Sequence, residues 1–387
     1  MYLQFGETLN YNYMKKLFLF LFVVVSCNFV SAQNADLSSV KATTTLSGYQ
    51  YPRILPGNRV EFQIKAPNAQ KVQLDLGKLY DMSKDANGIW SVITEPQGSG
   101  IHYYSMVIDG VSVADPASES FFGCSRMMSC VEVPYEQNTT QYNIKNVPHG
   151  DVRTVRYFSN VTNSWRIMYV YTPADYDKNI SKKYLVLYII HGGGEDARGW
   201  VQQGRTDIIL DNLAAEGKVV PMLVVSLDAN ISGFDNVEKE IMDNVVPFVE
   251  KKFRVDARAD KRALAGLSLG GMYTLYVGIP HTDFFHYLGV FSSGWFAQNN
   301  SFMNLSKERE GNYDYMKANV DKINHNLKLF WISQGGKEDI AYQNCQIMNE
   351  KIKQFGIKYK YYESLSGGHT WPVWREDLFL FAPHLFK

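Results

Sequence analysis

The sequence contains little cysteine and no excess of charge, and both facts narrow the kinds of protein it can encode. Only four of its 387 residues are cysteine, which is too few for a disulfide-stabilised scaffold, and their spacing does not match a metal site. Basic and acidic residues each number 39, so the net charge is zero. A basic surface for nucleic acid or for an anionic membrane is therefore not expected.

Long hydrophobic runs are also missing after the start of the chain, so no transmembrane anchor is expected. The apolar run over residues 17–25 follows a pair of lysines and precedes a small-residue cleavage site before Gln33. This pattern is typical of a signal peptide. We predict a leader over residues 1–32, with Met14 as the true start, and export to the periplasm or the extracellular space.

An alternative interpretation of the leader involves Cys27. The residues before it resemble a lipobox, which would make the mature protein a lipoprotein. Simple cleavage before Gln33 is favoured, because the cleavage site is good and no acidic stretch follows Cys27. Of the cysteines that remain after cleavage, Cys124 and Cys130 could form a disulfide or stay as two free thiols.

Apolar and polar residues alternate between residues 49 and 134. The alternation is clear over 59–65 and 72–76, and Asp109-Gly110 is a strong signal for a hairpin turn. Short strands at roughly ten-residue spacing predict an antiparallel β-sandwich of the immunoglobulin-like kind.

The pattern changes in the second part of the chain, where strands alternate with helices. Residues 184–190 and 222–227 are almost continuously apolar, as expected for strands buried on both faces. Residues 206–217 and 236–253 have helical spacing. The alternation predicts an α/β domain with a mostly parallel sheet and helices on both faces. The predicted order is a leader over 1–32, a linker over 33–48, the sandwich over 49–134, a connector over 135–153 and the α/β domain over 154–387.

One short stretch carries the strongest chemical signal. Gly-Leu-Ser-Leu-Gly at residues 266–270 follows an apolar run and precedes a glycine-rich, apolar segment. This is the pattern of a nucleophile elbow, a strand-to-helix turn that exposes the hydroxyl of Ser268. A glycine-rich loop that merely begins a helix has the same pattern, so the other catalytic groups must be found elsewhere.

A catalytic serine needs hydrogen-bond donors for the oxyanion that forms. His-Gly-Gly-Gly at residues 191–194 follows the most apolar predicted strand, and its glycines let backbone N–H groups approach a ligand oxygen. We expect one donor from Gly193 and the other from the backbone of Leu269, and a structural role for His191. A phosphate-binding loop is the alternative, but the lysine and hydroxyl residue that such a loop requires do not follow.

The serine also needs a base and a carboxylate that orients the base. Asp339 follows a predicted strand over 327–332 and a glycine turn, which places it at the carboxyl edge of the sheet; Glu338 is the rival. Among the eight histidines, only His369 follows both the serine and the acid in a glycine-framed loop. Oxyanion loop, serine, acid and histidine thus occur in the chain order of α/β-hydrolases.

These motifs resemble the "putative esterase" (esterase D-like) family, and within it the feruloyl and acetyl xylan esterases of carbohydrate esterase family 1. The residues that carry the resemblance are His-Gly-Gly-Gly with Trp200, Gly-Leu-Ser-Leu-Gly-Gly, Gly-Lys-Glu-Asp at 336–339, and Gly-His-Thr-Trp at 368–371 with Trp374. The resemblance covers about residues 145–387. Lys337 departs from it, because threonine is frequent there in the family. The preceding sandwich is similar to early-set immunoglobulin-like domains akin to family 48 carbohydrate-binding modules.

The resemblance implies an α/β-hydrolase fold with Ser268 as nucleophile, Asp339 as acid and His369 as base, with no metal or cofactor. It implies an exported serine esterase that removes feruloyl or acetyl groups from plant cell-wall xylan. Four tryptophans could stack on an aryl acid or a sugar ring: Trp200, Trp295, Trp371 and Trp374. The alternatives are an esterase for a ferric enterobactin-type siderophore and a carbohydrate-binding protein with an inactive hydrolase domain. The oligomeric state stays open.

Overall fold

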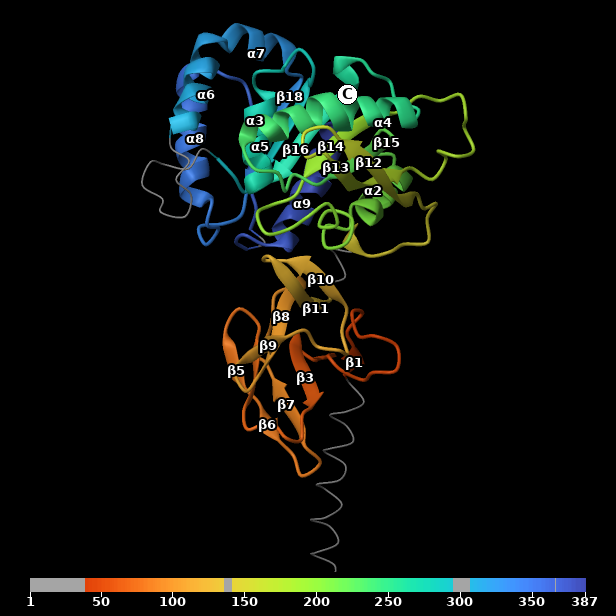
Figure 1. The fold of residues 1–387 in the computed structure, drawn as a ribbon, viewed down its shortest axis with the longest axis vertical. Helices are drawn as coiled ribbons and strands as arrows, with labels where there is room; N and C mark the ends of the chain where they lie inside the picture. The colour runs from red at the N-terminus through yellow and green to blue at the C-terminus, as the bar shows by residue number, and fades with distance from the viewer. Residues whose placement is uncertain (1–38, 136–140, 295–306, 366) are drawn as a thin grey trace, which may run out of the picture. The chain divides into compact units, whose positions relative to one another are not determined.

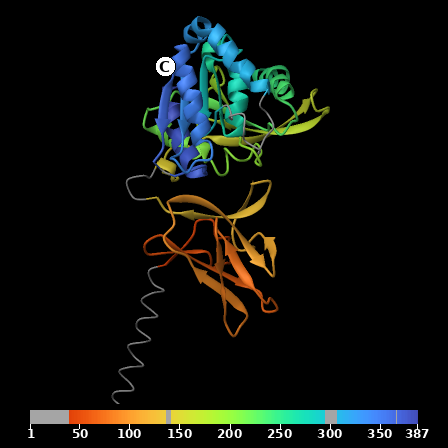
Figure 2. The same ribbon diagram turned by 90° about the vertical axis from the view of Figure 1, so that its left-hand side faces the viewer.

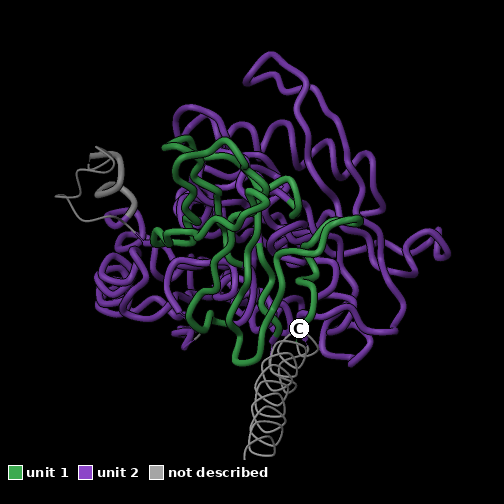
Figure 3. The backbone as a smooth tube through the Cα atoms, turned by 90° about the horizontal axis from the view of Figure 1, so that it is seen from below, with its two compact units in different colours: residues 1–98, 102–119, 131–134 green, residues 99–101, 120–130, 135–387 purple. Residues whose placement is uncertain are grey.

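The structure is a computed structural model of the chain, and it describes residues 39–135, 141–294, 307–365 and 367–387. The predicted leader, with Cys27, lies outside the described residues. The chain falls into two compact units, coloured separately in Figure 3. Of the described residues, the first unit comprises 39–98, 102–119 and 131–134, and the second comprises 99–101, 120–130 and those from 135 onward.

The first unit is built from antiparallel strands, as its alternating sequence predicts. One sheet has the order β1-β2-β3-β7-β6. The other has the order β10-β11-β8-β4-β5 with β9 beside β8, and its residues 120–130, in β10 and β11, are assigned to the second unit. Val60 and Phe62 of β3 pack with Leu74 of β4 in the core between the sheets. The strands are β1 (Val40–Lys41), β2 (Arg53–Leu55), β3 (Arg59–Lys65), β4 (Val72–Asp75), β5 (Leu79–Asp81), β6 (Ser83–Lys84), β7 (Ile89–Ile93), β8 (Gly100–Ile108), β9 (Val111–Val113), β10 (Ser120–Gly123) and β11 (Arg126–Val133).

The hairpin turn predicted at Asp109-Gly110 is present between β8 and β9. Ile108 pairs with Val111, so the loop has two residues, and both have positive φ angles, 47° and 87°. These are the backbone angles that a two-residue hairpin requires.

The linker predicted over residues 33–48 is wrong for its described part. Val40–Lys41 form β1 and pair with β2, and the small side chains of Ala42 and Thr44 are buried. The guanidinium of Arg53 donates hydrogen bonds of 2.8 Å to both the hydroxyl and the carbonyl of Ser39. Small polar residues are typical of linkers, but here their size lets them pack along the edge of a sheet.

The second unit is an α/β domain around an eight-stranded sheet of order β12-β13-β15-β14-β16-β17-β18-β19 (Figure 1). In this order, all neighbouring strands from β15 to β19 are parallel. β13 is antiparallel to both β12 and β15, so the sheet is mixed but mostly parallel, as predicted. The strands are β12 (Asp151–Ser159), β13 (Ser164–Thr172), β14 (Leu185–Ile190), β15 (Met222–Leu227), β16 (Arg262–Leu267), β17 (Tyr287–Phe291), β18 (Leu329–Gln334) and β19 (Lys360–Glu363).

Helices pack around this sheet, as Figures 1 and 2 show. Tyr188 and Ile190 of β14 point into a core that α3, α5 and α8 cover. On the other face, Phe381 of α9 packs against Phe291 and Trp331, with ring centroids 5.4 and 6.2 Å away. The helices are α2 (Thr206–Ala215), α3 (Phe234–Lys239), α4 (Val246–Lys252), α5 (Leu269–Gly278), α6 (Lys307–Ala318), α7 (Val320–Asn326), α8 (Tyr342–Phe355) and α9 (Trp371–Phe381). Among the described residues, no helix has both the length and the apolar composition that crossing a membrane requires.

The helix predicted over residues 236–253 contains a turn that sequence reasoning missed. A π-helical segment, Glu240–Val245, lies between α3 and α4. Pro247 lies in the first turn of α4. It has no N–H to offer the carbonyl four residues earlier, and its ring collides with that carbonyl, so the preceding turn widens. Two boundaries also differ from the prediction, because β12 begins at Asp151, within the predicted connector, and the hairpin over 120–130 belongs to the second unit.

Candidate active site

Ser268 is the single residue between β16 and α5. Its backbone angles, φ 51° and ψ −115°, are strained for a residue with a Cβ atom. Gly270 makes the turn possible, because a Cβ atom there would lie 2.5 Å from the carbonyl oxygens of Ile190 and His191. The segment therefore has the strand–turn–helix geometry of a nucleophile elbow.

His369 and Asp339 lie in hydrogen-bonding contact. Nδ1 of His369 is 2.7 Å from Oδ1 of Asp339, while the rival Glu338 is exposed on the same loop. The buried Asp339 carboxylate also accepts the backbone N–H groups of Gly335 and Ala341, at 3.0 and 2.8 Å. Burial raises the pKa of Asp339, but the hydrogen bond with His369 and the charge of that ring outweigh it and lower the pKa below its usual value. An ionised Asp339 can therefore hold the imidazole and stabilise its protonated form.

The serine and the carboxylate lie at the carboxyl ends of strands separated by β17. Ser268 follows β16, and Asp339 lies in the loop that follows β18. The hydroxyl of Ser293, just after β17, donates to the carbonyl of Ser268 at 2.6 Å. The N–H of Ser292 donates to the carbonyl of Ser333 on β18 at 2.7 Å. These contacts connect the elbow to the strand that carries the acid, at the edge where sites of open α/β sheets gather.

The glycine loop over 191–194 lies directly against the elbow. A Cβ atom built on Gly192 would be 3.5 Å from Cβ of Ser268, and one built on Gly193 would be 3.9 Å from the side chain of Leu269. Leu269 is the first residue of α5, where backbone N–H groups have no acceptor within the helix. The two backbone positions predicted as oxyanion donors are therefore neighbours beside the serine.

His191 holds the glycine loop in place. It is buried, its Nδ1 is 2.8 Å from the carbonyl of Gly192, and its Nε2 accepts the N–H of Ala229 at 3.1 Å. Nε2 also lies 3.4 Å from Oδ1 of Asp228, so both ring nitrogens of His191 have polar partners. This arrangement agrees with the structural role predicted for His191.

Glu195, directly after the glycine loop, is a residue that sequence reasoning missed. Its side chain is buried, and it accepts the indole N–H of Trp371 at 2.9 Å. Burial raises the pKa of this carboxyl to about 7, against the opposing effect of His191. The carboxyl thus links the oxyanion loop to the segment after His369. The position of Glu195 directly after the glycines could have identified it from the sequence, but its burial could not be predicted there.

The tryptophans predicted to stack on substrate are core residues in the described structure. Trp200 is fully buried, its indole N–H donates to a backbone carbonyl at 3.0 Å, and its ring meets Trp371 edge-on at 5.4 Å. Trp371 and Trp374 are 2% and 6% exposed, and Trp374 packs edge-on against His369 at 5.1 Å. Rings packed in this way offer no open face, so the prediction is wrong for these three. Trp374 instead packs against the imidazole, and Trp371 packs against Trp374 and Trp200. Trp295 lies outside the described residues.

The cysteines and acidic groups of the site do not assemble a metal centre in the described part of the chain. No group of three or more His, Cys, Asp or Glu side chains there could hold a metal ion. Cys124 and Cys130, for which a disulfide was one possibility, are free thiols, as is Cys345.

A family model described as "Putative esterase" matches residues 159–385. Over 358 residues the chain is 31% identical to the "Endo-1,4-beta-xylanase/feruloyl esterase" of Xylanibacter ruminicola, a match that covers 88% of this chain and 46% of that protein. It is 28% identical over 271 residues to "Endo-1,4-beta-xylanase Y" of Acetivibrio thermocellus, covering 64% of this chain and 23% of that protein. The chain therefore spans about half or less of the length of these relatives.

Solved structures show the same fold. A "ferulic acid esterase" superimposes with a TM-score of 0.54 at 26% identity, over 61% of this chain and 98% of that one. The enterochelin esterase of Shigella flexneri superimposes with a TM-score of 0.65 over 85% of this chain and 92% of that one. Its identity is only 16%, so this second likeness concerns the fold alone.

Proposed function

The chain belongs to the "Putative esterase" family, and on that premise we propose that it is an exported serine esterase that removes feruloyl or acetyl groups from plant cell-wall xylan. One observation carries the proposal: the 2.7 Å contact between His369 and Asp339, at the same sheet edge as the strained Ser268. The relative from Xylanibacter ruminicola supports the choice of acyl group and polysaccharide, because its name joins a xylanase to a feruloyl esterase.

The proposed mechanism follows from these groups. The hydroxyl oxygen of Ser268 attacks the ester carbonyl while Nε2 of His369 takes its proton, because Nδ1 is held by Asp339. The N–H groups of Gly193 and Leu269 hold the oxyanion of the tetrahedral intermediate. The imidazolium then gives its proton to the departing sugar oxygen, and the acyl group stays on the serine. Water, deprotonated by the imidazole, attacks the acyl-enzyme and regenerates the free hydroxyl.

The siderophore esterase predicted as an alternative shares this fold, and a fold does not choose a substrate. The xylan interpretation is favoured by the relative with 31% identity, whose printed name concerns xylan and feruloyl esters. Competing turnover of a catecholate trilactone and a feruloylated xylan oligosaccharide separates the two substrates. We expect faster cleavage of the oligosaccharide ester.

The direct test is release of free acid from arabinoxylan that has been treated with a xylanase. We expect chromatography to detect ferulate or acetate only when the protein is added. A preparation that is folded by circular dichroism but releases neither acid would overturn the proposed substrate. The inactive carbohydrate-binding alternative would then require that small esters such as methyl ferulate also stay intact.

A further inference from the structure

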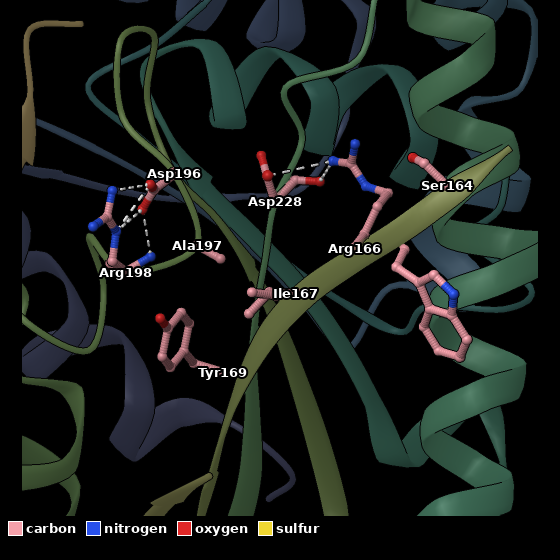
Figure 4. Close-up of a pocket in the computed structure, with 9 residues that line it drawn as sticks. Ser164, Arg166, Ile167, Tyr169, Asp196, Ala197, Arg198 and Asp228 are labelled. Atoms are coloured by element: carbon pink, nitrogen blue, oxygen red, sulfur yellow. Dashed lines mark hydrogen bonds and ion pairs between the residues drawn. The ribbon is translucent and has the colours of Figure 1, made fainter. Parts of the chain in front are cut away.

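A pocket lies at the carboxyl edge of the α/β sheet, on the opposite side of β16 from Asp339 (Figure 4). Its volume is about 440 Å³, and it is formed by β13, by the loop after β14 and by the residue that follows β15. The lining residues used below are Trp165, Arg166, Tyr169, Asp196, Arg198 and Asp228.

The strand register fixes how far this pocket is from the elbow. Tyr169 pairs with Ser226, Ser226 pairs with Ile189, and Ile189 pairs with Ala265. Three strand spacings of about 4.8 Å place Tyr169 about 15 Å from Ala265, which is three residues before Ser268. A chain of a few sugar units is long enough to reach from the serine to this pocket. A small ester bound at the serine is too short to contact it.

The two guanidinium groups that line the pocket are already paired with carboxylates. The guanidinium of Arg198 donates to both oxygens of the Asp196 carboxylate, from Nε at 3.0 Å and from Nη2 at 2.6 Å. Arg166 is only 11% exposed and lies 3.5 Å from the carboxylate of Asp228 and 3.4 Å from that of the buried Glu240. Figure 4 shows the pairs Arg198–Asp196 and Arg166–Asp228 among the lining residues. Each of the two cations is paired with at least one carboxylate, so neither is left to attract a phosphate. A sugar hydroxyl suits such pairs, because it donates to a carboxylate and accepts from a guanidinium.

Beside these polar pairs lies an exposed aromatic surface. The side chains of β12 and β13 alternate between buried and solvent-facing, and the solvent-facing set contains Trp165, which is 70% exposed. Phe158, its cross-strand partner, meets the indole edge-on at 5.8 Å and is itself exposed. The contact with Phe158 thus orients the indole of Trp165, and most of the indole surface remains exposed to solvent. An aromatic face next to paired polar groups is the usual composition of a site that fixes an uncharged, amphipathic ligand.

We propose that this pocket binds the uncharged pentose chain that carries the scissile ester, with the sugar rings against Trp165 and their hydroxyls on the Asp196–Arg198 pair and the carboxylate of Asp228. The inference rests on the proposed function and adds to it a binding site away from the serine. It makes the enzyme prefer esters on an oligosaccharide over esters of small alcohols. An anionic ligand is disfavoured because both guanidinium groups are already paired with carboxylates.

The test compares Trp165→Ala with the unchanged protein on two esters of the same acid, methyl ferulate and a feruloylated xylo-oligosaccharide. We expect kcat/KM for the oligosaccharide ester to fall about tenfold, mainly through KM, because a truncated aromatic anchor weakens binding by that order. Activity on methyl ferulate should stay unchanged. Trp165→Phe should retain most of the preference.

Ile180→Ala is the matched control. Ile180 is also exposed, but it lies between the end of β13 and the start of β14, at the opposite edge of the sheet. Its substitution should change neither substrate. Calorimetric titration with xylohexaose, which contains no ester, reports on the pocket without catalysis, and the affinity should fall in Trp165→Ala only.

The outcomes separate the inference from the proposed function. If both esters are cleaved and Trp165→Ala keeps the substrate preference and the xylohexaose affinity of the unchanged protein, the inference is overturned while the esterase proposal stands. If neither ester is cleaved, the esterase proposal fails, and the titration alone decides the inference. Absent xylohexaose binding, or binding that Trp165→Ala does not weaken, counts against it in every case.

Discussion

At the scale of single residues, the site is defined by residues with a strained backbone, a buried charge or a shifted pKa. Ser268 has a positive φ angle, Asp339 is a buried carboxylate with three hydrogen bonds, and Glu195 is a buried carboxyl with a raised pKa. Strain and shifted protonation of this kind are concentrated at functional sites. The order of serine, acid and histidine could be predicted because each follows a strand and is framed by glycine. The burial of Glu195 and of Trp200 depends on packing between distant segments, which no local pattern records.

Glu195 should make stability depend on pH in a defined window. Its pKa is raised from 4.5 to about 7 in the folded protein, so the folded state holds this proton more tightly than the unfolded state does. The free energy of unfolding therefore falls as the pH rises from about 4.5 to about 7, and the loss is complete above that range. In Glu195→Gln this loss is absent, and the variant still accepts the indole N–H of Trp371. We expect it to be more stable than the unchanged protein by about 3 kcal/mol at pH 8, with little difference at pH 5.

The measurement is urea denaturation at both pH values, followed by tryptophan fluorescence. Among the described tryptophans, all except Trp90 belong to the second unit, so the signal reports mainly on the unit that contains Glu195. Glu338→Gln, at an exposed position of the acid loop, is the control and should show no such pH-dependent difference. A stability difference for Glu195→Gln that is the same at pH 5 and pH 8 would contradict the assignment.

At the scale of elements, the long apolar strands were predictable, and short or context-dependent elements were not. β14 and β15 are buried on both faces, which makes their sequences continuously apolar. β1 has two residues and therefore no period to detect. The π-helical turn could have been predicted from Pro247. The buried Glu240 in this turn could not, because it accepts hydrogen bonds of 2.6 Å from hydroxyl groups of β12, which is far away in the chain.

The elbow gives a prediction about two glycines of the same site. A Cβ atom on Gly270 would meet two backbone carbonyl oxygens at 2.5 Å, whereas one on Gly193 would meet only the side chain of Leu269 at 3.9 Å. Gly270→Ala should therefore lower the free energy of unfolding by about 2–3 kcal/mol, because backbone must move to admit the methyl group. Gly193→Ala should stay within about 0.5 kcal/mol of the unchanged protein. Equal urea midpoints for the two variants would show that the turn is not as tight as described.

At the scale of the whole molecule, the division into a β-sheet unit and an α/β unit follows from the change of period along the chain. The boundary is less simple than the period indicates, because residues 120–130 belong to the second unit. The N–H of Ser125 in this hairpin donates to the carbonyl of Gly194 at 2.8 Å, so it supports the oxyanion loop. A strand pattern reveals that a hairpin exists, but not which core it joins.

The leader belongs to this scale as well. We predict that the chain, expressed in a bacterium with its own leader, is exported and cleaved before Gln33. Mass spectrometry of the mature N-terminus should then begin at Gln33, and Cys27→Ser should leave this result unchanged. A mature chain that starts at Cys27 and carries lipid, and that is lost in Cys27→Ser, would show the lipoprotein alternative to be right.

The central claim is that Ser268, activated by His369 and Asp339, is the nucleophile. Reaction with a fluorophosphonate probe, followed by peptide mass spectrometry, tests it most directly. The account predicts one adduct, on Ser268, that is absent in Ser268→Ala, forms about 10⁴-fold more slowly in Asp339→Asn and is unchanged in Glu338→Gln. A folded protein that takes no label, or an adduct that persists in Ser268→Ala, would contradict it.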